Sequence, residues 1–127
     1  MKQGKFIIGI LVILLIVGIG FWAGNKPGKY AGLTQCLTEK GVKFYGTFWC
    51  PHCQKQKAMF GNDAKTLPYI ECSNPDGKSQ TQVCKDALIE SYPTWEFSDG
   101  SRILGEQSPE FLAQKANCTA SLETQGE

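Results

Sequence analysis

Two cysteines in the motif Cys50-Pro-His-Cys53 are the residues of this chain whose spacing best suits chemistry. The stretch 42–49 before them is apolar, β-branched and aromatic, which favours a buried strand. Pro51 suits the first position of a helix, because its missing N–H would be unpaired there anyway. The first sulfur would then lie beside unpaired N–H groups and the positive end of the helix dipole, which favours its thiolate. We therefore predict that Cys50 is the nucleophile of a redox pair and that Cys53 is its more buried resolving thiol.

His52 lies between the two cysteines and is the only histidine in the chain. It could donate to the Cys50 thiolate or stabilise it by charge, and the alternative is an exposed side chain without such a role. Stabilising the thiolate stabilises the reduced form, so the disulfide becomes a better oxidant. Zinc is not expected, because a zinc ribbon needs a second Cys-x-x-Cys, and eleven residues separate Cys72 from Cys84. We predict no metal and no cofactor besides the Cys50–Cys53 disulfide.

The chain begins with an apolar segment in which residues 6–25 carry no charge. About 20 helical residues at roughly 1.5 Å each match the thickness of a bilayer's hydrocarbon core, about 30 Å. A cleaved signal peptide would have a shorter apolar stretch and small residues at its cut site, whereas Phe21 and Trp22 interrupt the end of this one. We predict that residues 1–25 form a short cytoplasmic tail and an uncleaved transmembrane signal anchor.

Cysteine usage indicates the side of the membrane. All six cysteines follow the anchor, which is typical of an oxidising compartment. We expect a single-pass membrane protein whose soluble domain is extracytoplasmic, in a periplasm, at a cell exterior or in a thylakoid lumen. The balance of 13 Lys and Arg against 12 Asp and Glu gives no support for nucleic-acid binding.

Residues 26–118 show the alternating pattern of one α/β domain, followed by a polar C-terminal tail at 119–127. We expect helices at 30–40, 50–60, 79–90 and 110–117, and strands at 42–49, 67–72, 94–97 and 102–104. The third helix should be amphipathic, with Val83, Cys84, Ala87 and Leu88 on one side. The Asp-Gly pair at 99–100 suits a tight hairpin turn. This order predicts a mixed sheet of about four strands flanked by helices.

Several segments resemble the thioredoxin superfamily. These are Phe48-Trp-Cys-Pro-His-Cys53, Ser91-Tyr-Pro-Thr-Trp-Glu-Phe97, and the Asp-Gly turn followed by Gly105. A closer match is the thioredoxin-like domain associated with bacterial and plant homologues of vitamin K epoxide reductase. That likeness is carried by residues 44–54, by Tyr69-Ile-Glu-Cys72 and by residues 91–95. It implies a thioredoxin fold, preceded here by one N-terminal transmembrane helix.

The resemblance also implies roles for residues near the motif. Pro93 corresponds to the superfamily's cis-proline, which would turn the Tyr92 backbone toward Cys50 and let an extended substrate pair with it. Trp49 and Tyr92 are then expected to contact substrate. Thioredoxins carry a buried acid six positions before the first cysteine, where this chain has Phe44. Glu71 is a possible substitute, but a solvated carboxylate at a strand end is the interpretation we favour.

Domains of this kind oxidise exported thiols and are reoxidised by a quinone-linked membrane partner. The resemblance therefore implies three partners: exported cysteine-containing proteins, a vitamin K epoxide reductase-like membrane protein, and the membrane. This chain has one span instead of a fused multi-span reductase, so the reoxidising protein is separate or has been cut away. The alternatives are a membrane-tethered disulfide reductase or isomerase and a non-catalytic peptide-binding module.

The remaining four cysteines are candidates for structural disulfides. Related domains have cysteines at places comparable to Cys72 and Cys84, where a bond would pin the turn-rich loop between them, and a second redox relay is the alternative. Cys36 and Cys118 would tie the two ends of the domain together if they paired. If the sheet holds their helices on opposite faces, free buried thiols are the alternative.

Overall fold

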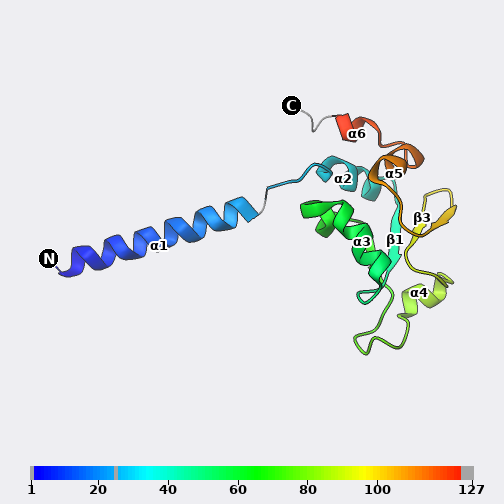
Figure 1. Cartoon of the computed structure of the whole chain (residues 1–127), viewed down its shortest axis with the longest axis horizontal. Helices are drawn as coiled ribbons and strands as arrows, with labels where there is room; N and C mark the ends of the chain where they lie inside the picture. Colours follow the sequence, from blue (N-terminus) through cyan, green and yellow to red (C-terminus); the bar gives the residue numbers. More distant parts are fainter. Residues whose placement is uncertain (1, 25, 124–127) are drawn as a thin grey trace.

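A long apolar helix and a small α/β domain make up the chain (Figure 1). The computed structural model describes residues 2–24 and 26–123. The first helix, α1 (Lys2–Gly24), extends away from the domain and exposes its apolar side chains. Its stretch Gln3–Ala23 is long and apolar enough to cross a membrane. This helix is therefore compatible with a single-pass anchor or with a signal sequence.

The domain is built on one four-stranded sheet. Its elements are α2 (Ala31–Glu39), β1 (Lys43–Gly46), α3 (Pro51–Met59), the 3-10 helix η1 (Gly61–Thr66), β2 (Tyr69–Glu71), α4 (Gln82–Asp86), β3 (Thr94–Glu96), β4 (Arg102–Leu104), α5 (Pro109–Lys115) and α6 (Ala120–Glu123). The strand order is β2-β1-β3-β4, with β1 parallel to β2 and β3 antiparallel to β1 and β4. This arrangement confirms the predicted mixed sheet with flanking helices.

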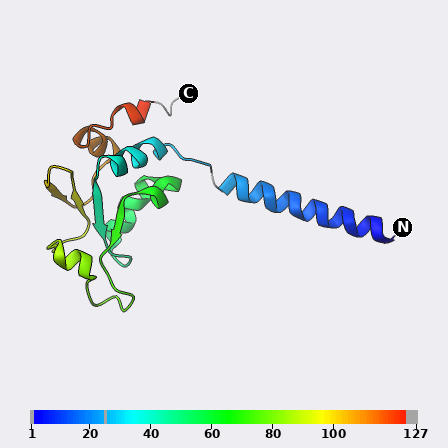
Figure 2. The same cartoon turned by 180° about the vertical axis from the view of Figure 1, so that it is seen from behind.

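Two hydrophobic clusters lie on opposite faces of the sheet. On the larger face, Phe44 stacks on Trp95 with ring centroids 4.5 Å apart, and side chains from α2, α3 and α5 cover the pair. The smaller cluster surrounds Tyr45 and includes Cys84 of α4 and Ile89 just after it. Figures 1 and 2 show α4 at the end of the domain opposite α2 and α5. The alternation of Phe44 and Tyr45 between faces follows from the two-residue period of a strand.

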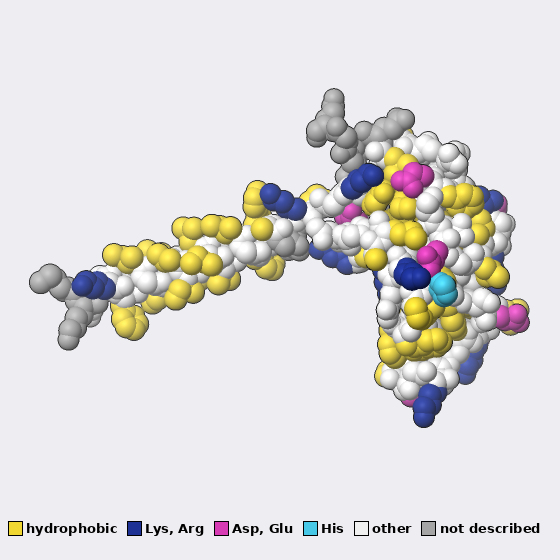
Figure 3. Space-filling model, viewed as in Figure 1, with side chains coloured by type: hydrophobic (Ala, Val, Ile, Leu, Met, Phe, Trp, Pro, Cys, Tyr) yellow, Lys and Arg dark blue, Asp and Glu magenta, His cyan; other side chains and the backbone are white. Residues whose placement is uncertain are grey.

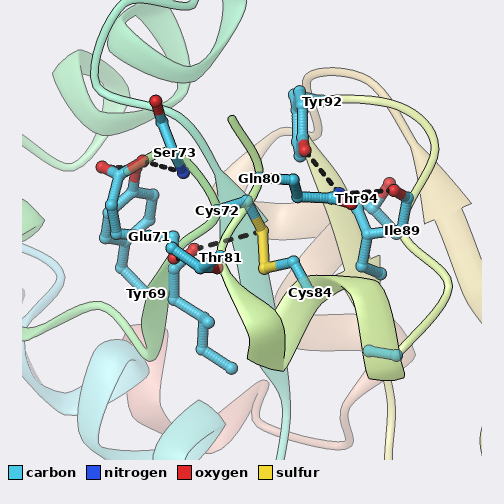
Figure 4. The surroundings of a disulfide bond; sticks show 12 residues. Tyr69, Glu71, Cys72, Ser73, Gln80, Thr81, Cys84, Ile89, Tyr92 and Thr94 are labelled. Carbon is cyan, nitrogen blue, oxygen red and sulfur yellow. Dashed lines mark hydrogen bonds between the residues drawn. A yellow bond between two sulfur atoms is a disulfide. The ribbon is translucent and has the colours of Figure 1, made fainter. Parts of the chain in front are cut away.

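Two disulfides close the domain. Cys36 of α2 is bonded to Cys118, which lies between α5 and α6, with the Cα atoms 5.9 Å apart. This bond is possible because α2 and α5 cover the same face of the sheet. The sequence alone did not decide whether the two helices lie on the same face or on opposite faces. The second disulfide joins Cys72, at the end of β2, to Cys84 of α4 (Figure 4). Each bond connects segments that also contribute to one of the two cores.

Two elements are shorter than the sequence predicts. The strand expected at 42–49 ends at Gly46, because the chain turns there and the Cys50 N–H donates to the carbonyl of Thr47. The helix expected at 79–90 is limited to Gln82–Asp86 and ends as Leu88 takes a left-handed conformation, with φ at 55°. Val83 and Leu88 are exposed, and Ile89 is buried in their place. The predicted apolar face of this helix is therefore wrong at Val83 and Leu88, whereas Cys84 is buried and Ala87 packs against the smaller cluster.

Two short helices are present where the sequence predicts none. In η1, Asp63 is buried, and its carboxylate accepts hydrogen bonds of 2.8 Å from the N–H groups of Gly28 and Tyr30. These hydrogen bonds attach the start of the domain to η1, the short helix that follows α3. Helix α6 lies in the segment expected to be a polar tail, and Leu122 packs against the larger core.

Candidate active site

The two cysteines of the motif lie where β1 turns into α3. Cys50 caps the helix, and its Sγ accepts a hydrogen bond of 3.4 Å from the N–H of Cys53. Pro51 follows in the first turn, where its missing N–H leaves no helical hydrogen bond unmade. Both cysteines are free thiols, with 5% of Cys50 and 1% of Cys53 exposed. The helix start thus holds one thiol near the surface and a second one beneath it.

The environment of Cys53 keeps its sulfur protonated. Burial raises the pKa of the Cys53 thiol to about 12, and the neighbouring Cys50 contributes to the rise. A backbone hydrogen bond from Thr47 and the positive charge of Lys57 act in the opposite direction, but burial outweighs them. At neutral pH, Cys53 is therefore a neutral thiol, which suits the resolving thiol of a mixed disulfide.

The fold brings Tyr92, Pro93 and Trp49 close to Cys50. The Tyr92–Pro93 peptide bond is cis, and the Cys50 thiol donates to the Tyr92 carbonyl at 3.8 Å. The Trp49 ring meets the Tyr92 ring edge-on at 6.2 Å, and its Nε1 donates to Ser73 Oγ at 3.0 Å. The fold thus brings these three residues to the nucleophile. An extended peptide laid along the Tyr92 backbone would pass the Cys50 sulfur.

His52 lies beside the cysteine pair, but its ring contacts an acid. Its Nδ1 lies 2.6 Å from Oε1 of Glu106, and 65% of the His52 side chain is exposed. The sequence predicts that His52 donates to the Cys50 thiolate or stabilises it by charge, with an exposed side chain without such a role as the alternative. Among the described residues no hydrogen bond joins His52 to Cys50, and the His52 ring is bonded to Glu106 instead. Glu106 was missed because it lies in the loop before α5, far from the motif in the sequence, and only the fold brings it to His52.

Comparison with known proteins shows the family of this chain. The family model for thioredoxin matches residues 37–118. The chain belongs to the thioredoxin family. The Arabidopsis thaliana protein named thiol-disulfide oxidoreductase LTO1 is 50% identical over 81 residues, which are 59% of this chain and 21% of that protein. The chain thus spans about a fifth of the length of this relative. The family, the relative and the free cysteine pair together support thiol–disulfide oxidoreductase activity.

Phe44 occupies the position at which thioredoxins carry a buried acid. Its side chain is fully buried in the larger core, so this position supplies no carboxylate. Glu71 ends β2, as we expected from the sequence, but it is only partly exposed and its carboxylate is hydrogen-bonded. Its Oε1 accepts from the N–H groups of Phe48 and Ser73, at 3.2 and 2.8 Å, and its Oε2 accepts from the Tyr69 hydroxyl at 2.8 Å. Glu71 therefore holds the active-site turn against the end of β2.

Gly46 makes room for Cys53 to pack beside Tyr69. A Cβ at Gly46 would lie 2.9 Å from Cys53 Sγ and 2.8 Å from Tyr69 Cε2, both closer than real Cβ contacts. The Lys57 ammonium stacks on the same tyrosine ring, 3.4 Å from its centroid. The buried thiol is therefore positioned by a glycine, an aromatic ring and a cation, and the motif itself marks none of them.

The Gly46→Ala variant should be destabilised by about 1–3 kcal/mol, because the added methyl group overpacks the space between Cys53 and Tyr69. Denaturant unfolding of the full chain with its disulfides intact measures this change. Gly4→Ala is a matched control, because a Cβ there meets no atom within 4 Å. An unchanged unfolding midpoint for Gly46→Ala would show that Cys53 is not held by this contact.

Iodoacetamide at pH 7–8 should modify Cys50 of the reduced chain and leave Cys53 unmodified. Raising the Cys53 pKa from 9.0 to about 12 lowers its thiolate fraction about a thousandfold in this pH range, and the thiolate is the reactive form. The protection should disappear only as the pH approaches 12. Mass spectrometry of tryptic peptides identifies the labelled residue. Faster labelling of Cys53 than of Cys50 would reverse their assigned roles.

The His52→Ala variant should make the Cys50–Cys53 couple more reducing. The substitution removes a group that can carry positive charge near Cys50 and leaves the Glu106 carboxylate unpaired, and both changes disfavour the thiolate. A tenfold change in the equilibrium constant corresponds to about 30 mV, so we expect tens of millivolts in glutathione buffers. The double variant His52→Ala/Glu106→Gln should return toward the wild-type potential. If His52→Ala leaves the potential unchanged, His52 plays no part in oxidising strength.

Proposed function

We propose that this chain is a membrane-anchored thiol–disulfide oxidant that acts outside the cytoplasm, with the Cys50–Cys53 disulfide as its redox group. The observation that carries the proposal is the arrangement at the start of α3. Cys50 lies beside the Tyr92 carbonyl and the cis Pro93, and the protonated Cys53 lies behind it. This arrangement supplies a nucleophile, a resolving thiol and a backbone edge for an extended substrate.

The reaction moves two electrons from a substrate dithiol to the Cys50–Cys53 disulfide. A substrate thiolate attacks Cys50 Sγ, the Cys50–Cys53 bond breaks, and Cys53 leaves and takes up a proton, as its raised pKa favours. A second substrate thiolate then attacks the substrate sulfur of the mixed disulfide. Cys50 departs as a thiolate, where the start of α3 stabilises its charge. The substrate gains one disulfide, and the pair ends reduced.

Exported cysteine-containing proteins are the proposed substrates. The face of the domain that carries the histidine also displays hydrophobic side chains (Figure 3). Phe48 and Trp49, which directly precede Cys50, are each about half exposed. Apolar surface beside the nucleophile suits an unfolded polypeptide, whose own apolar residues are still accessible.

Location outside the cytoplasm is supported by α1 and by the two disulfides outside the active site. The span Gln3–Ala23 would attach the domain to a membrane. Cys36–Cys118 and Cys72–Cys84 need an oxidising compartment to persist. A mature N-terminus beyond Trp22, or protection of the domain from protease in intact spheroplasts, would contradict this placement.

A quinone-linked vitamin K epoxide reductase-like membrane protein is the proposed oxidant of the reduced pair. The resemblance of residues 44–54 and 91–95 to domains associated with such reductases supports this partner. The test is co-reconstitution of the full chain with such a protein and a quinone in vesicles. Cys50 and Cys53 should be reoxidised only when both are present. Equal reoxidation without the membrane protein would remove it as the partner.

The direction of the reaction is tested by the reduction potential of Cys50–Cys53 in the full chain. We expect a potential well above the value of about −270 mV that reducing thioredoxins have. The chain should also oxidise a reduced peptide faster than it reduces insulin at equal concentration. A potential at or below the thioredoxin value would instead make it a tethered reductase or isomerase.

A further inference from the structure

Lys57 lies on the same side of α3 as the buried thiol of Cys53. The two residues are four positions apart, which is about one turn of a helix, so their side chains are neighbours along its surface. Cys53 is buried, and Lys57 is partly buried. No carboxylate in the described part of the chain forms an ion pair with Lys57. A positive charge that no ion pair neutralises is therefore present near the resolving thiol.

The Tyr69 ring holds this charge in place. The Lys57 ammonium lies 3.4 Å from the centroid of the ring, in a cation–π contact. The edge of the same ring and the Cys53 sulfur approach one point from two sides, because they lie 2.8 and 2.9 Å from the position of a Cβ at Gly46. The ring thus has the cation on its face and the thiol near its edge.

Neighbouring residues fix the Tyr69 ring. Its hydroxyl donates to Glu71 Oε2 at 2.8 Å, and Glu71 Oε1 accepts from the N–H groups of Phe48 and Ser73 (Figure 4). The Phe44 ring meets the Tyr69 ring edge-on, with the centroids 5.1 Å apart. Phe44, at the position where thioredoxins carry a buried acid, thus helps to support a ring that binds a cation.

Negative charge develops on the Cys53 sulfur whenever the Cys50–Cys53 bond breaks or forms. When a substrate thiolate attacks Cys50 Sγ, this bond breaks, and Cys53 leaves as a thiolate that then takes a proton from water. In the reverse step the Cys53 thiolate attacks Cys50 Sγ and expels the substrate thiolate. Burial disfavours the charge and raises the pKa of the Cys53 thiol, and the positive charge of Lys57 acts against that rise.

We propose that Lys57 supplies the counter-charge for the Cys53 sulfur while the Cys50–Cys53 bond breaks and forms, and that Tyr69 and Glu71 position it. The proposal rests on the proposed function, in which this bond is broken and remade in each cycle. Lys57 should then affect the rate of exchange and not the reduction potential. At neutral pH neither the disulfide nor the protonated Cys53 thiol carries a charge on which the ammonium could act.

Single-turnover reduction of the oxidised full chain in detergent tests the proposal. A dithiothreitol thiolate attacks Cys50 Sγ, and Cys53 leaves. The second thiol of the reagent then releases Cys50, so the products are the reduced chain and the cyclic disulfide of the reagent. Samples are quenched with acid at successive times, and mass spectrometry measures the fraction of reduced chain. The potential of each variant is measured separately in glutathione buffers.

Lys57→Met should slow this reduction about tenfold at pH 7, because Cys53 leaves without its counter-charge. Lys57→Arg keeps a cation that can stack on the ring, and its rate should stay within about twofold of the parent rate. Lys55→Met is the matched control, because it removes the same charge from an exposed position of α3, and it should react like the parent. The potential of Lys57→Met should change by less than about 10 mV, whereas a tenfold change in the equilibrium constant would be about 30 mV.

The effect of Lys57 should also depend on Cys53. In a Cys53→Ala chain whose Cys50 is bonded to β-mercaptoethanol, Cys53 is no longer the leaving group. Adding Lys57→Met to this chain should therefore change its rate of reduction by dithiothreitol less than about twofold. A loss as large as in the parent would overturn the proposal, because Lys57 would then act by attracting the attacking thiolate.

The remaining outcomes separate this role of Lys57 from the function beneath it. Equal rates for the parent and Lys57→Met would overturn the counter-charge and leave the oxidoreductase standing. A slower rate accompanied by a shift of tens of millivolts would also overturn it, because Lys57 would then act on the Cys50 thiolate of the reduced form. If Lys57→Met does not fold, Lys57→Gln removes the same charge and has the same expected results. Failure of dithiothreitol to reduce a Cys50–Cys53 bond in the parent would overturn the proposed function and this role together.

Discussion

Cys53→Ala should accumulate disulfide-linked complexes with exported proteins, whereas Cys50→Ala should form almost none. In the first variant Cys50 remains at the start of α3, near the Tyr92 backbone. Its thiolate can still attack a substrate disulfide and form a mixed disulfide. Nothing then resolves the adduct, because the thiol beneath it is gone. In the second variant the remaining thiol is 1% exposed and protonated, with a pKa of about 12.

Non-reducing gels of membranes that carry each variant measure the difference, which should be at least tenfold. A Cys50→Ala/Cys53→Ala variant is the control for complexes made through the other cysteines, and it should form none. Equal trapping by the two single variants would show that both thiols are accessible. Trapping by Cys50→Ala alone would exchange their roles.

Replacing Cys36 and Cys118 together with alanine should lower the free energy of unfolding by about 4.5 kcal/mol. The bond closes a loop of 82 residues, and in the chain-entropy model the stabilisation grows with the logarithm of loop length. Replacing Cys72 and Cys84, which are 12 residues apart, should cost about 3 kcal/mol by the same relation. Small domains are stable by only about 5–15 kcal/mol, so either loss is a large fraction of the total.

Urea unfolding of the full chain in detergent gives these energies, with Cys50 and Cys53 alkylated in every variant so that only one bond differs. The order of the two losses is the sharper test. If the Cys72–Cys84 variant were the less stable one, packing of α4 on Tyr45 would contribute more than loop closure. A Cys36–Cys118 variant as stable as the parent would mean that α2 and α5 are held together by their core contacts alone.

The sequence was sufficient for those features whose causes are local. Pro51 and the spacing of Cys50 and Cys53 define a redox pair at a helix start, and the Asp-Gly pair at 99–100 defines the hairpin between β3 and β4. Strand and helix periodicity was also enough to predict the mixed sheet. These patterns involve residues within a few positions of each other, where backbone geometry determines which side chains meet.

Contacts between distant segments could not be predicted in the same way. Glu106 meets His52 across 54 positions, and neither residue carries a signal for the other. The hydrogen bond that Glu71 accepts from the Phe48 N–H depends on how the active-site turn folds back over β2. Leu88 was assigned to a buried helical face because it is apolar at the right spacing, and its left-handed backbone overrides that pattern. In each case tertiary geometry decided the outcome.

The hydrogen bonds from Gly28 and Tyr30 to Asp63 attach the segment after α3 to the residues that follow α1. Asp63 follows the C-terminal end of α3, whereas Cys50 caps the N-terminal end, and the nine residues of this helix measure about 14 Å. With α1 in a bilayer, the start of α3 would therefore lie farther from the lipid than its end (Figure 1). The membrane protein that we propose as the oxidant would then have to extend a thiol pair above the lipid surface to reach Cys50, unless the whole domain tilted toward it.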